Sequence, residues 1–484
     1  MESPVLTKNS LQQVFNPNQF RQVGYELIDL LANHLENVQN EPTSKVLPYT
    51  QPEKELDFWR QHFAQADGLN DTFQTILQRS IKVHHPRYIG HQVAAPAPVS
   101  SLAGLMADLL SNGMGVYEMG MAANGIERVL IEFMNRRVGY SPKAGGIMTS
   151  GGTLANLTAL ITARKVSAPS DVWSEGHQEK LAIMVSEAAH YCIDRAARIM
   201  GLGTKGIIKI PVDERFKLRI DFLPDYLAKA KADGLHVFAV IGCASSTATG
   251  SYDDLAALAD FCETENLWLH VDGAHGGGVV FSKKYKALAK GIHRADSIAI
   301  DFHKMLLTPA LTTALLYKNG SDSYKTFAQK AEYLWDAPQS EEWYNSGKRT
   351  FECTKLMMPI KVYALLKAHG KGIFGANIDR LYDLGRTFAQ MIKERPNFEL
   401  LIEPEANIVN YRYVPDSAQN IDVLNAQIRQ TLTEAGQFYI VSTVINGRRY
   451  LRSAIMNPLM TDGDLEDLLA EIERIGKMVV RQWQ

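Results

Sequence analysis

Between residues 145 and 318, six short apolar runs alternate with segments of helical pattern, and this alternation constrains the fold more than any other feature. The runs span residues 181–185, 206–210, 237–242, 267–271, 297–300 and 313–317. Strands that are apolar on both faces and separated by helices are typical of a mostly parallel sheet covered by helices on both sides. The sequence therefore predicts an α/β fold, and ligands of such folds bind at the carboxyl ends of the strands.

Two of these runs lead to side chains of opposite charge. The run 267–271 leads into Asp272, and the run 297–300 is closely followed by Lys304. Pyridoxal phosphate (PLP) requires a carboxylate that keeps its ring nitrogen protonated and a lysine that forms an aldimine with its aldehyde group. Taken singly, Asp272 is typical of a turn or helix-capping acid and Lys304 of a surface lysine. As a pair at the ends of two buried strands, they predict that the chain binds PLP.

A glycine-rich turn at residues 145–153 precedes a helical pattern at residues 154–161. Glycines allow backbone N–H groups to approach a phosphate closely, and the N-terminus of a helix adds a favourable dipole and unpaired donors. The turn therefore predicts a binding site for the PLP phosphate, to which the Thr153 hydroxyl contributes a further donor. The alternative for this segment alone is a simple loop with a serine or threonine cap.

Five short motifs, in this order and spacing, resemble the group II PLP-dependent amino-acid decarboxylases. They are residues 85–88 (His-Pro-Arg-Tyr), 149–153 (Thr-Ser-Gly-Gly-Thr), 187–190 (Glu-Ala-Ala-His), 270–272 (His-Val-Asp) and 303–304 (His-Lys). This family includes decarboxylases of aromatic amino acids, glutamate, cysteine sulfinate and 2,4-diaminobutyrate. The resemblance implies the PLP-dependent transferase fold of type I, with a mostly parallel sheet, helices on both faces and a smaller α+β C-terminal domain. It also implies a homodimer with active sites at the subunit interface.

The resemblance implies which residues contact PLP. They are Gly152, Thr153 and His303 at the phosphate, Asp272 at the ring nitrogen, Lys304 at the aldehyde, His190 and Ala274 against the two ring faces, and Thr247 at the ring substituents. His190 is also a catalytic candidate. Taken alone, a histidine after an alanine pair is more often a packed structural residue.

The chain departs from the family pattern at two positions. Asp301-Phe302 stands where many relatives have Asn-Pro. A carboxylate near a phosphate is unfavourable unless it is protonated, paired or turned away. His275 stands where relatives that act on aromatic amino acids tend to have tyrosine, and the sequence assigns it no role.

Two further residues, by the same resemblance, distinguish a decarboxylase from other PLP enzymes. Arg349 aligns with an arginine that holds the substrate α-carboxylate, for which a planar guanidinium is suited because it forms two parallel hydrogen bonds. The orientation of that carboxylate selects which bond breaks. Tyr333 aligns with a tyrosine of the catalytic loop, here about residues 319–348, that returns a proton to Cα and favours amine over aldehyde formation. Without the resemblance, Arg349 is a surface arginine and Tyr333 a packed loop aromatic.

The substrate side-chain pocket implied by the resemblance contains His91, Gln92, Tyr117 and Glu118. The pair Tyr117-Glu118 resembles the glutamate and cysteine-sulfinate branch, so the expected substrate has a polar or acidic side chain, of the glutamate, aspartate or cysteine-sulfinate type. The alternatives are an aromatic amino acid and 2,4-diaminobutyrate, whose ammonium group could pair with Glu118. Two other classes of protein also stay open: an aminotransferase, and a non-catalytic scaffold on the same fold.

The overall composition favours a large enzyme without nucleic-acid or membrane partners. The 484 residues carry 51 basic and 53 acidic side chains, and a net charge of −2 leaves no electropositive footprint for nucleic acid. The longest apolar stretch, residues 305–317, is interrupted by threonines and a proline and is too short to span a membrane. Because the N-terminus lacks the pattern of a secretory signal, the expected location is the cytoplasm.

Neither disulfides nor a metal site are expected. The four cysteines, Cys192, Cys243, Cys262 and Cys353, are scattered, as is typical of reduced thiols in a long chain. The doublet at residues 84–85 and the spaced pair at residues 270 and 272 lack the further ligands that a metal site needs. The only cofactor expected is therefore PLP, with a small amino acid as the substrate.

Hydrophobic periodicity divides the chain into three regions. Residues 1–80 form an N-terminal helical segment, 81–363 the large PLP-binding domain and 364–484 the small C-terminal domain. A helix over about residues 18–38 carries an apolar stripe, for which core packing is the default and the dimer interface is what the resemblance implies. The expected elements near the C-terminus are a long helix over 356–394, strands at 398–401, 408–413 and 450–454, and a closing helix over 462–478.

Overall fold

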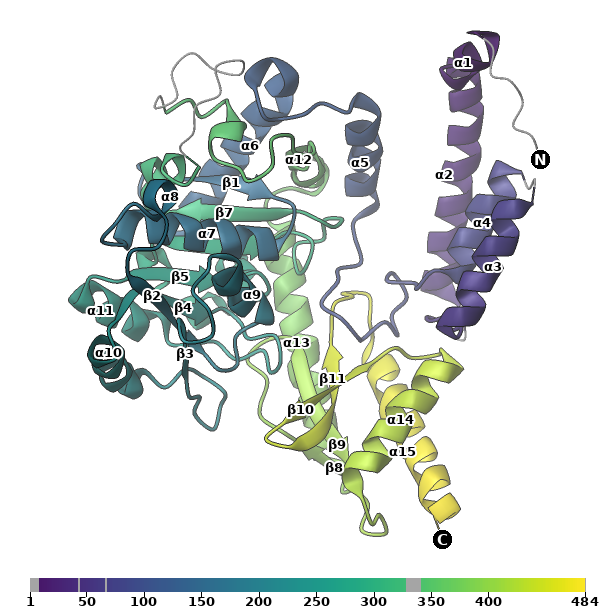
Figure 1. Ribbon diagram of the computed structural model, residues 1–484. Coiled ribbons are helices and arrows are strands. Elements are labelled where there is room, and N and C mark those ends of the chain that lie inside the picture. Colours follow the sequence, from purple (N-terminus) through teal and green to yellow (C-terminus); the bar gives the residue numbers. More distant parts are fainter. Residues whose placement is uncertain (1–7, 42–43, 66–67, 328–340, 484) are drawn as a thin grey trace.

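The computed structural model describes residues 8–41, 44–65, 68–327 and 341–483 (Figure 1). Its helices are α1 (Lys8–Val14), α2 (Pro17–Asn40), α3 (Pro52–Ala64), α4 (Leu69–Arg79), α5 (Pro98–Leu110), α6 (Tyr117–Val138), α7 (Gly152–Ser167), α8 (Val172–Glu175), α9 (Tyr191–Ile199), α10 (Leu223–Ala232), α11 (Leu255–Glu265), α12 (Pro359–His369), α13 (Ile373–Lys393), α14 (Ile421–Ala435) and α15 (Asp462–Trp483). Its strands are β1 (Gly145–Thr149), β2 (Lys180–Ser186), β3 (Ile207–Ile210), β4 (Leu235–Cys243), β5 (Trp268–Asp272), β6 (Ser297–Asp301), β7 (Thr313–Tyr317), β8 (Phe398–Leu400), β9 (Ile408–Tyr413), β10 (Val441–Ile445) and β11 (Arg448–Ala454).

The large sheet has the order β1-β7-β6-β5-β4-β2-β3. Strands β6, β5, β4, β2 and β3 are parallel, whereas β7 runs antiparallel to both β1 and β6. The strand residues are buried on both faces; in β6, Ile298 and Ile300 join one apolar core and Ala299 joins the other. Helices lie on both sides of this sheet (Figure 1). The predicted mostly parallel α/β fold is confirmed.

Residues 145–149 correct one part of the sequence analysis, because they form strand β1 and not a turn. This strand pairs with β7, with Gly145 opposite Tyr317 and Thr149 opposite Thr313. The glycines allow close approach of neighbouring backbone: a Cβ on Gly146 would lie 2.5 Å from the carbonyl oxygen of Leu315. The turn itself is confined to Ser150 and Gly151, directly before α7.

The smaller sheet near the C-terminus is antiparallel throughout, in the order β10-β11-β9-β8. The predicted strands correspond to β8, β9 and β11, while β10 was missed. The long helix expected over 356–394 is two helices, because Gly370 adopts a φ of +77° that ends α12. The closing helix α15 is present, and the domain boundaries remain a proposal.

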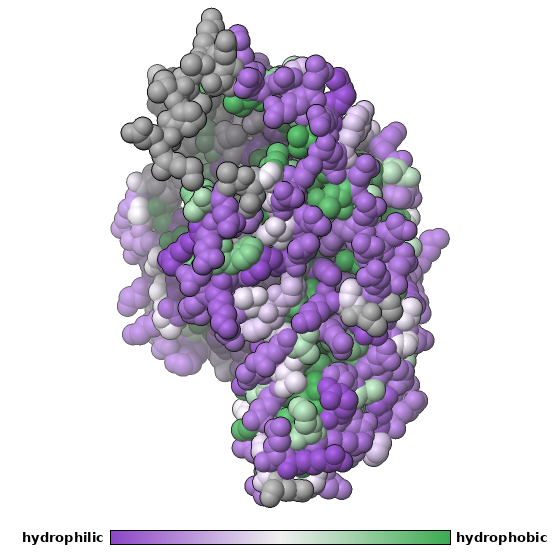
Figure 2. Space-filling model, turned by 90° about the vertical axis from the view of Figure 1, so that its right-hand side faces the viewer, coloured by the Kyte–Doolittle hydropathy of each residue, from purple (hydrophilic) through white to green (hydrophobic). Residues whose placement is uncertain are grey.

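The N-terminal helices α2, α3 and α4 stand beside the body of the molecule and approach it near their lower end (Figure 1). There, the backbone N–H groups of Val46 and Leu47 donate to the carbonyl oxygen of Gly436. The predicted helix over 18–38 is confirmed as α2, but Val38 is its only buried residue, so its apolar stripe does not pack in the core of the protomer. From the side of these helices, apolar areas are separate within a mainly hydrophilic surface (Figure 2).

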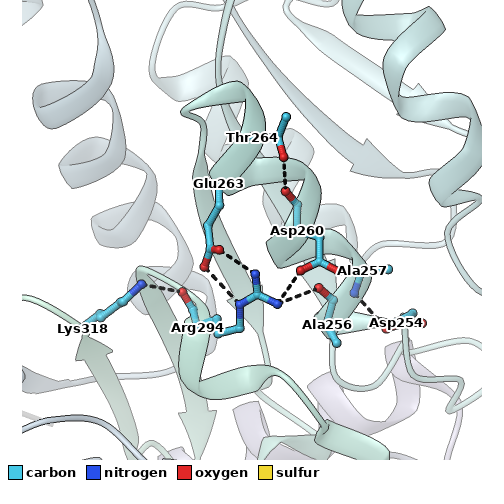
Figure 3. A network of polar contacts seen from close by, with 8 residues as sticks. All are labelled: Asp254, Ala256, Ala257, Asp260, Glu263, Thr264, Arg294 and Lys318. Carbon is cyan, nitrogen blue, oxygen red and sulfur yellow. Dashed lines mark hydrogen bonds and ion pairs between the residues drawn. The ribbon is translucent and has the colours of Figure 1, made fainter.

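A cluster of charged residues fixes the entry to β6 (Figure 3). The guanidinium of Arg294 donates to Glu263 at 3.0 and 2.6 Å and to Asp260 at 2.7 Å, both on α11. The Lys318 ammonium donates to the carbonyl oxygen of Arg294 at 3.1 Å. These bonds tie α11 to the segment that enters β6, although their exposure limits their contribution to stability. No helix among the described residues is long and apolar enough to cross a membrane.

Candidate active site

The carboxyl ends of β5 and β6 bring Asp272 and Lys304 to the same place. The two strands are parallel neighbours, with Asp272 opposite Ala299, and Lys304 follows the end of β6. Burial lowers the pKa of His190, while the charge of Asp272 raises it and that of Lys304 lowers it further. The charges of Asp272 and Lys304 thus act on the His190 ring. The structure therefore places His190 in the same electrostatic environment as Asp272 and Lys304.

The N-terminus of α7 opens toward this space. Gly151 has a φ of +114°, which favours glycine, and no side chain caps the helix. The first intrahelical bond runs from Ala155 N–H to Gly151, so among the described residues the N–H groups of Gly152, Thr153 and Leu154 have no hydrogen-bond partner. Such donors at a helix N-terminus suit a phosphate.

Gly152 faces the residues that follow β5 and β6. A Cβ added to Gly152 would lie 3.1 Å from the Cβ of Ala274 and 3.1 Å from Asp301 Oδ1. A larger side chain would therefore fill the space between the helix and the strand ends. An open helix N-terminus, a lysine and an acid around such a space fit the phosphate, aldehyde and ring nitrogen of PLP.

Asp301, the departure from the family pattern, is buried and paired. Its Oδ1 accepts a hydrogen bond from Thr313 Oγ1 at 2.5 Å, and its Oδ2 lies 3.2 Å from Lys304 Nζ and 3.5 Å from His303 Nε2. The Nδ1 atom of His303 lies 3.0 Å from the Thr312 carbonyl oxygen and 3.1 Å from the Thr312 backbone nitrogen, which holds the ring with Nε2 toward Asp301. The carboxylate is thus surrounded by donors within the protomer.

A second group of residues comes from the smaller domain. Arg452 on β11 is 6% exposed, and it donates from Nη2 to the carbonyl oxygen of Thr247 at 2.7 Å. Burial, followed by the charges of Arg452 and Arg429, lowers the pKa of His91. Burial also lowers the pKa of His275, to about 3, with further contributions from the charges of Lys304 and Arg452. Arg452 is therefore the cation that the smaller domain brings toward Lys304.

Arg349 does not join these residues. Its guanidinium donates to the carbonyl oxygen of Gly146 at 3.2 Å and to that of Trp343 at 2.9 Å. Gly146 lies three residues before the end of β1, roughly 10 Å along the strand from the phosphate-binding turn. The contact of Arg349 with the substrate stays a prediction, while these two hydrogen bonds occupy both terminal nitrogens of its guanidinium within the protomer. Sequence analysis missed Arg452, whose signal is a single arginine within the apolar strand pattern at 450–454.

The remaining predicted residues lie in three different settings. Tyr333 lies outside the described residues. Tyr117 and Glu118 are exposed at the start of α6, where the Tyr117 ring lies 5.6 Å from that of Tyr344. His91 is exposed beside Tyr439, with ring centroids 5.8 Å apart. Within one protomer, the structure brings His91 toward Arg452 and leaves Tyr117 on the surface.

His270 lies beneath Asp272 in a fully bonded polar network. Asn156 donates from its amide nitrogen to the Cys192 sulfur, so its oxygen accepts from His270 Nε2 at 2.9 Å. The other ring nitrogen, Nδ1, accepts from the Ser297 hydroxyl at 2.9 Å. Burial lowers the pKa of His270 to about 4, so the ring is neutral. Among the described residues, no three His, Cys, Asp or Glu side chains gather as metal ligands would.

The buried histidines predict a loss of stability in acid. Burial lowers the pKa of His85 and His270 to about 4 and that of His275 to about 3, from an ordinary value of 6.5. As the pH falls below about 6.5, the unfolded chain binds protons that the folded chain does not, so the free energy of unfolding decreases until these pKa values are passed. Asp253 contributes to the free energy of unfolding with the opposite pH dependence, since burial raises its pKa to about 6.

We expect the free energy of unfolding of the apoprotein, measured in urea from pH 7.5 to pH 4.5, to fall by up to about 1.4 kcal/mol per pH unit for each buried histidine. Replacing the exposed His369 with asparagine should leave this slope unchanged, whereas His85→Asn should make it shallower. A free energy that stays constant between pH 7 and pH 5 would contradict the buried, neutral state of these rings.

A lysine and an acid at neighbouring strand ends, beside an uncapped helix N-terminus on an α/β fold, are together typical of PLP-dependent enzymes. Residues 53–414 match the family model described as "Pyridoxal-dependent decarboxylase conserved domain". The chain belongs to this family, and it is a PLP-dependent amino-acid decarboxylase and therefore a carboxy-lyase.

Three similar proteins illustrate the range of the family. The aromatic-L-amino-acid decarboxylase of Bacillus atrophaeus is 27% identical, over 95% of this chain and 96% of its own length. The L-2,4-diaminobutyrate decarboxylase of Acinetobacter baumannii is 28% identical, over 84% of this chain and 82% of its own. The crystal structure of mouse CSAD superimposes with a TM-score of 0.89 at 26% identity, and the match covers 95% of this chain and 99% of that one. These likenesses confirm the fold class and do not select a substrate.

Proposed function

We propose that Lys304 and Asp272 hold the two ends of the PLP ring, and the meeting of these residues at adjacent strand ends is the observation that carries this proposal. Gly152, Thr153 and His303 bind the phosphate, His190 and Ala274 lie against the two ring faces, and Thr247 contacts the ring substituents. Bound PLP accepts the electrons released when the bond between Cα and the carboxylate breaks. The protonated ring nitrogen that this requires is stabilised by the Asp272 carboxylate.

Arg452 replaces Arg349 in this proposal as the residue that holds the substrate α-carboxylate. It is buried, it is a cation close enough to His275 and His91 to lower their pKa values, and one side of its guanidinium is already fixed by Thr247. A guanidinium held in this way can present its other N–H groups to a carboxylate in one orientation. That orientation selects the bond that breaks.

Tyr333 remains our proposed donor of the proton that Cα receives after carbon dioxide leaves. Its support is the alignment of its segment with the catalytic loop of the family. A phenol is a suitable general acid where bulk water is excluded. His190 is a further catalytic candidate: its Nδ1 accepts from the Cys192 N–H at 3.4 Å, which leaves the proton of the neutral ring on Nε2.

We further propose a substrate with an acidic side chain, of the glutamate, aspartate or cysteine-sulfinate type. The support is the positive charge of Arg429, which acts on His91 in the segment expected to line the side-chain pocket and is not assigned to the α-carboxylate. The other candidates are 2,4-diaminobutyrate and aromatic amino acids, because relatives of nearly equal identity are named for them.

Carbon dioxide release from a panel of amino acids tests this substrate class. Purified, PLP-loaded protein is incubated with glutamate, aspartate, cysteine sulfinate, 2,4-diaminobutyrate, phenylalanine, tyrosine and tryptophan at equal concentrations. We expect the largest kcat/KM for one of the three acidic compounds. A larger value for diaminobutyrate or for an aromatic amino acid would reject the acidic substrate, and formation of a keto acid without carbon dioxide would indicate transamination.

A homodimer with active sites at the subunit interface is also proposed. Exposed apolar side chains on α5 and α6, including Leu105, Leu109, Met119 and Val129, offer a surface that a second copy of the chain would cover. Tyr117 lies on the same surface and would reach the partner's site. Light scattering should give twice the chain mass, and a Leu105→Asp, Leu109→Asp variant should be monomeric. We retain the cytoplasm as the proposed location, since all four cysteines are free thiols.

A further inference from the structure

The turn between β1 and α7 is held by a segment about two hundred residues later in the chain. Ser150 Oγ donates to Glu352 Oε1 at 2.6 Å. Three residues further on, Lys355 Nζ donates to the carbonyl oxygen of Met148 at 3.0 Å and to both oxygens of Glu127 at 2.8 and 2.7 Å. The segment therefore contacts β1 and its turn at two points that are two residues apart.

The Lys355 contact is shielded from solvent, and the contact between Ser150 and Glu352 is half-buried. Lys355 and Glu127 are 3% and 4% exposed, and the second carboxylate oxygen of Glu352, Oε2, is buried without a hydrogen-bond partner. The Thr350 hydroxyl donates to the carbonyl oxygen of Glu352 at 2.7 Å and fixes the backbone there. Hydrogen bonds to a charged group are stronger than neutral ones, and more so away from water. The bond between Ser150 and Glu352 is thus able to restrain the turn.

The direction of this bond determines what Ser150 does. Its hydroxyl hydrogen is donated to Glu352, because a carboxylate oxygen only accepts. The Ser150 hydroxyl therefore donates its hydrogen bond to the protein and not to a ligand. The first residues of α7, Gly152 to Leu154, carry the unpaired N–H groups.

We propose that Glu352 is a positioning residue for the phosphate-binding turn: by holding Ser150, it fixes the N–H groups of Gly152 and Thr153 where the PLP phosphate binds. The proposal rests on the phosphate-binding role given above to Gly152 and Thr153. A turn fixed before the ligand arrives loses less conformational freedom on binding, which increases affinity. Glu352 acts through Ser150 and does not itself contact the cofactor.

The negative charge of Glu352 would have the opposite effect on the affinity for PLP, since a carboxylate close to a phosphate repels it. The two effects separate in a comparison of variants. Glu352→Ala removes both the acceptor and the charge, whereas Glu352→Gln keeps an acceptor for the Ser150 hydroxyl and removes only the charge. If the hydrogen bond to Ser150 determines the affinity for the phosphate, Glu352→Ala weakens phosphate binding and Glu352→Gln does not. If repulsion matters, both variants bind the phosphate more tightly than the parent protein.

The experiment compares two aldehydes that both react with Lys304, PLP and the phosphate-free pyridoxal. Apoprotein is titrated with each, and binding is followed by the visible absorption of the lysine-linked ring. The ratio of the two dissociation constants, pyridoxal over PLP, measures the contribution of the phosphate. We expect this ratio to fall about tenfold in Glu352→Ala, as for loss of a charge-assisted hydrogen bond, and to stay within about twofold of the parent in Glu352→Gln.

Two further variants complete the test. Ser150→Ala should lower the ratio as Glu352→Ala does, and the double variant should lower it no further, because each change removes the same bond. Glu179→Ala is the matched control, since Ser170 Oγ donates to Glu179 at the same 2.6 Å outside the phosphate-binding turn. The ratio should not change in this control, while circular dichroism verifies that every variant is folded.

An unchanged or increased ratio in Glu352→Ala would overturn the proposal, and so would a loss in Glu352→Gln as large as in Glu352→Ala. Failure of the underlying function gives a different result. In that case the parent protein itself would attach neither aldehyde to Lys304, or would bind PLP no better than pyridoxal.

Discussion

Replacing Lys304 with alanine will abolish the covalent attachment of PLP and lower the turnover of any amino-acid substrate by at least about a thousandfold. The lysine is the amine placed at the end of β6, and its Nζ lies 3.2 Å from Asp301. Without it, the cofactor has no amine to join and the substrate amine has no linkage to displace. Reduction with borohydride followed by mass spectrometry measures the attachment, and carbon dioxide release measures the turnover.

Lys304→Arg separates the chemistry of this residue from its charge. Arginine keeps a cation beside the buried carboxylate of Asp301, so this variant should unfold at nearly the temperature of the parent protein. It should nevertheless carry no borohydride-stable label, because a guanidinium does not form the linkage. Lys325→Ala, a change at an exposed lysine elsewhere in the chain, should retain both label and activity. A label that persists on the Lys304→Ala chain would reject the assignment of Lys304.

Replacing Arg452 with alanine will lower kcat/KM by about thirtyfold or more, mainly through a higher KM for the amino acid. Loss of one partner from a buried, charge-assisted ion pair costs about 2–5 kcal/mol, because the carboxylate is left without its cation. Binding of PLP should change much less, since Arg452 bonds to the backbone carbonyl oxygen of Thr247 and is not among the residues proposed at the phosphate, the ring nitrogen or the aldehyde. Steady-state kinetics and PLP titration of the same preparation measure the two effects separately.

Two comparisons sharpen this prediction. Arg452→Lys should give an intermediate loss, because an ammonium keeps the charge but not the planar fork. Arg349→Ala should lower thermal stability, since its guanidinium bonds to Gly146 and Trp343, and should leave the KM within a few-fold of the parent. The opposite pattern, a large KM effect at Arg349 and none at Arg452, would restore the assignment made from the sequence.

The strands of the large sheet were predictable because each is a local pattern. A run of apolar residues bounded by helical segments reports burial on both faces, and β2 to β7 all correspond to such runs. Strand β1 was missed for a local reason as well. Its first two residues are glycines, which are typical of a turn. Only their tight packing against Leu315 and Gly320 shows that they belong to a strand.

The two arginines show what a sequence pattern leaves undecided. Arg349 and Arg452 are both single arginines near the C-terminal part of the chain, and a sequence pattern does not show which guanidinium is free to bind a substrate. The structure adds the contacts on which our proposal rests: the terminal nitrogens of Arg349 both bind backbone carbonyls, whereas Arg452 reaches the loop at Thr247. Asp301, unexplained in the sequence, proves to be paired with Thr313 and Lys304.

The sequence by itself determined the fold class, the cofactor and the residues at the ends of β5 and β6, because strand patterns and the side chains directly after them depend on short stretches of chain. Only the tertiary structure decided that Arg452 of the smaller domain meets the loop at Thr247 and that Glu352 meets the turn at Ser150. Those contacts join parts of the chain that are hundreds of residues apart. They depend on how whole elements pack against one another, and no local pattern of residues records that packing.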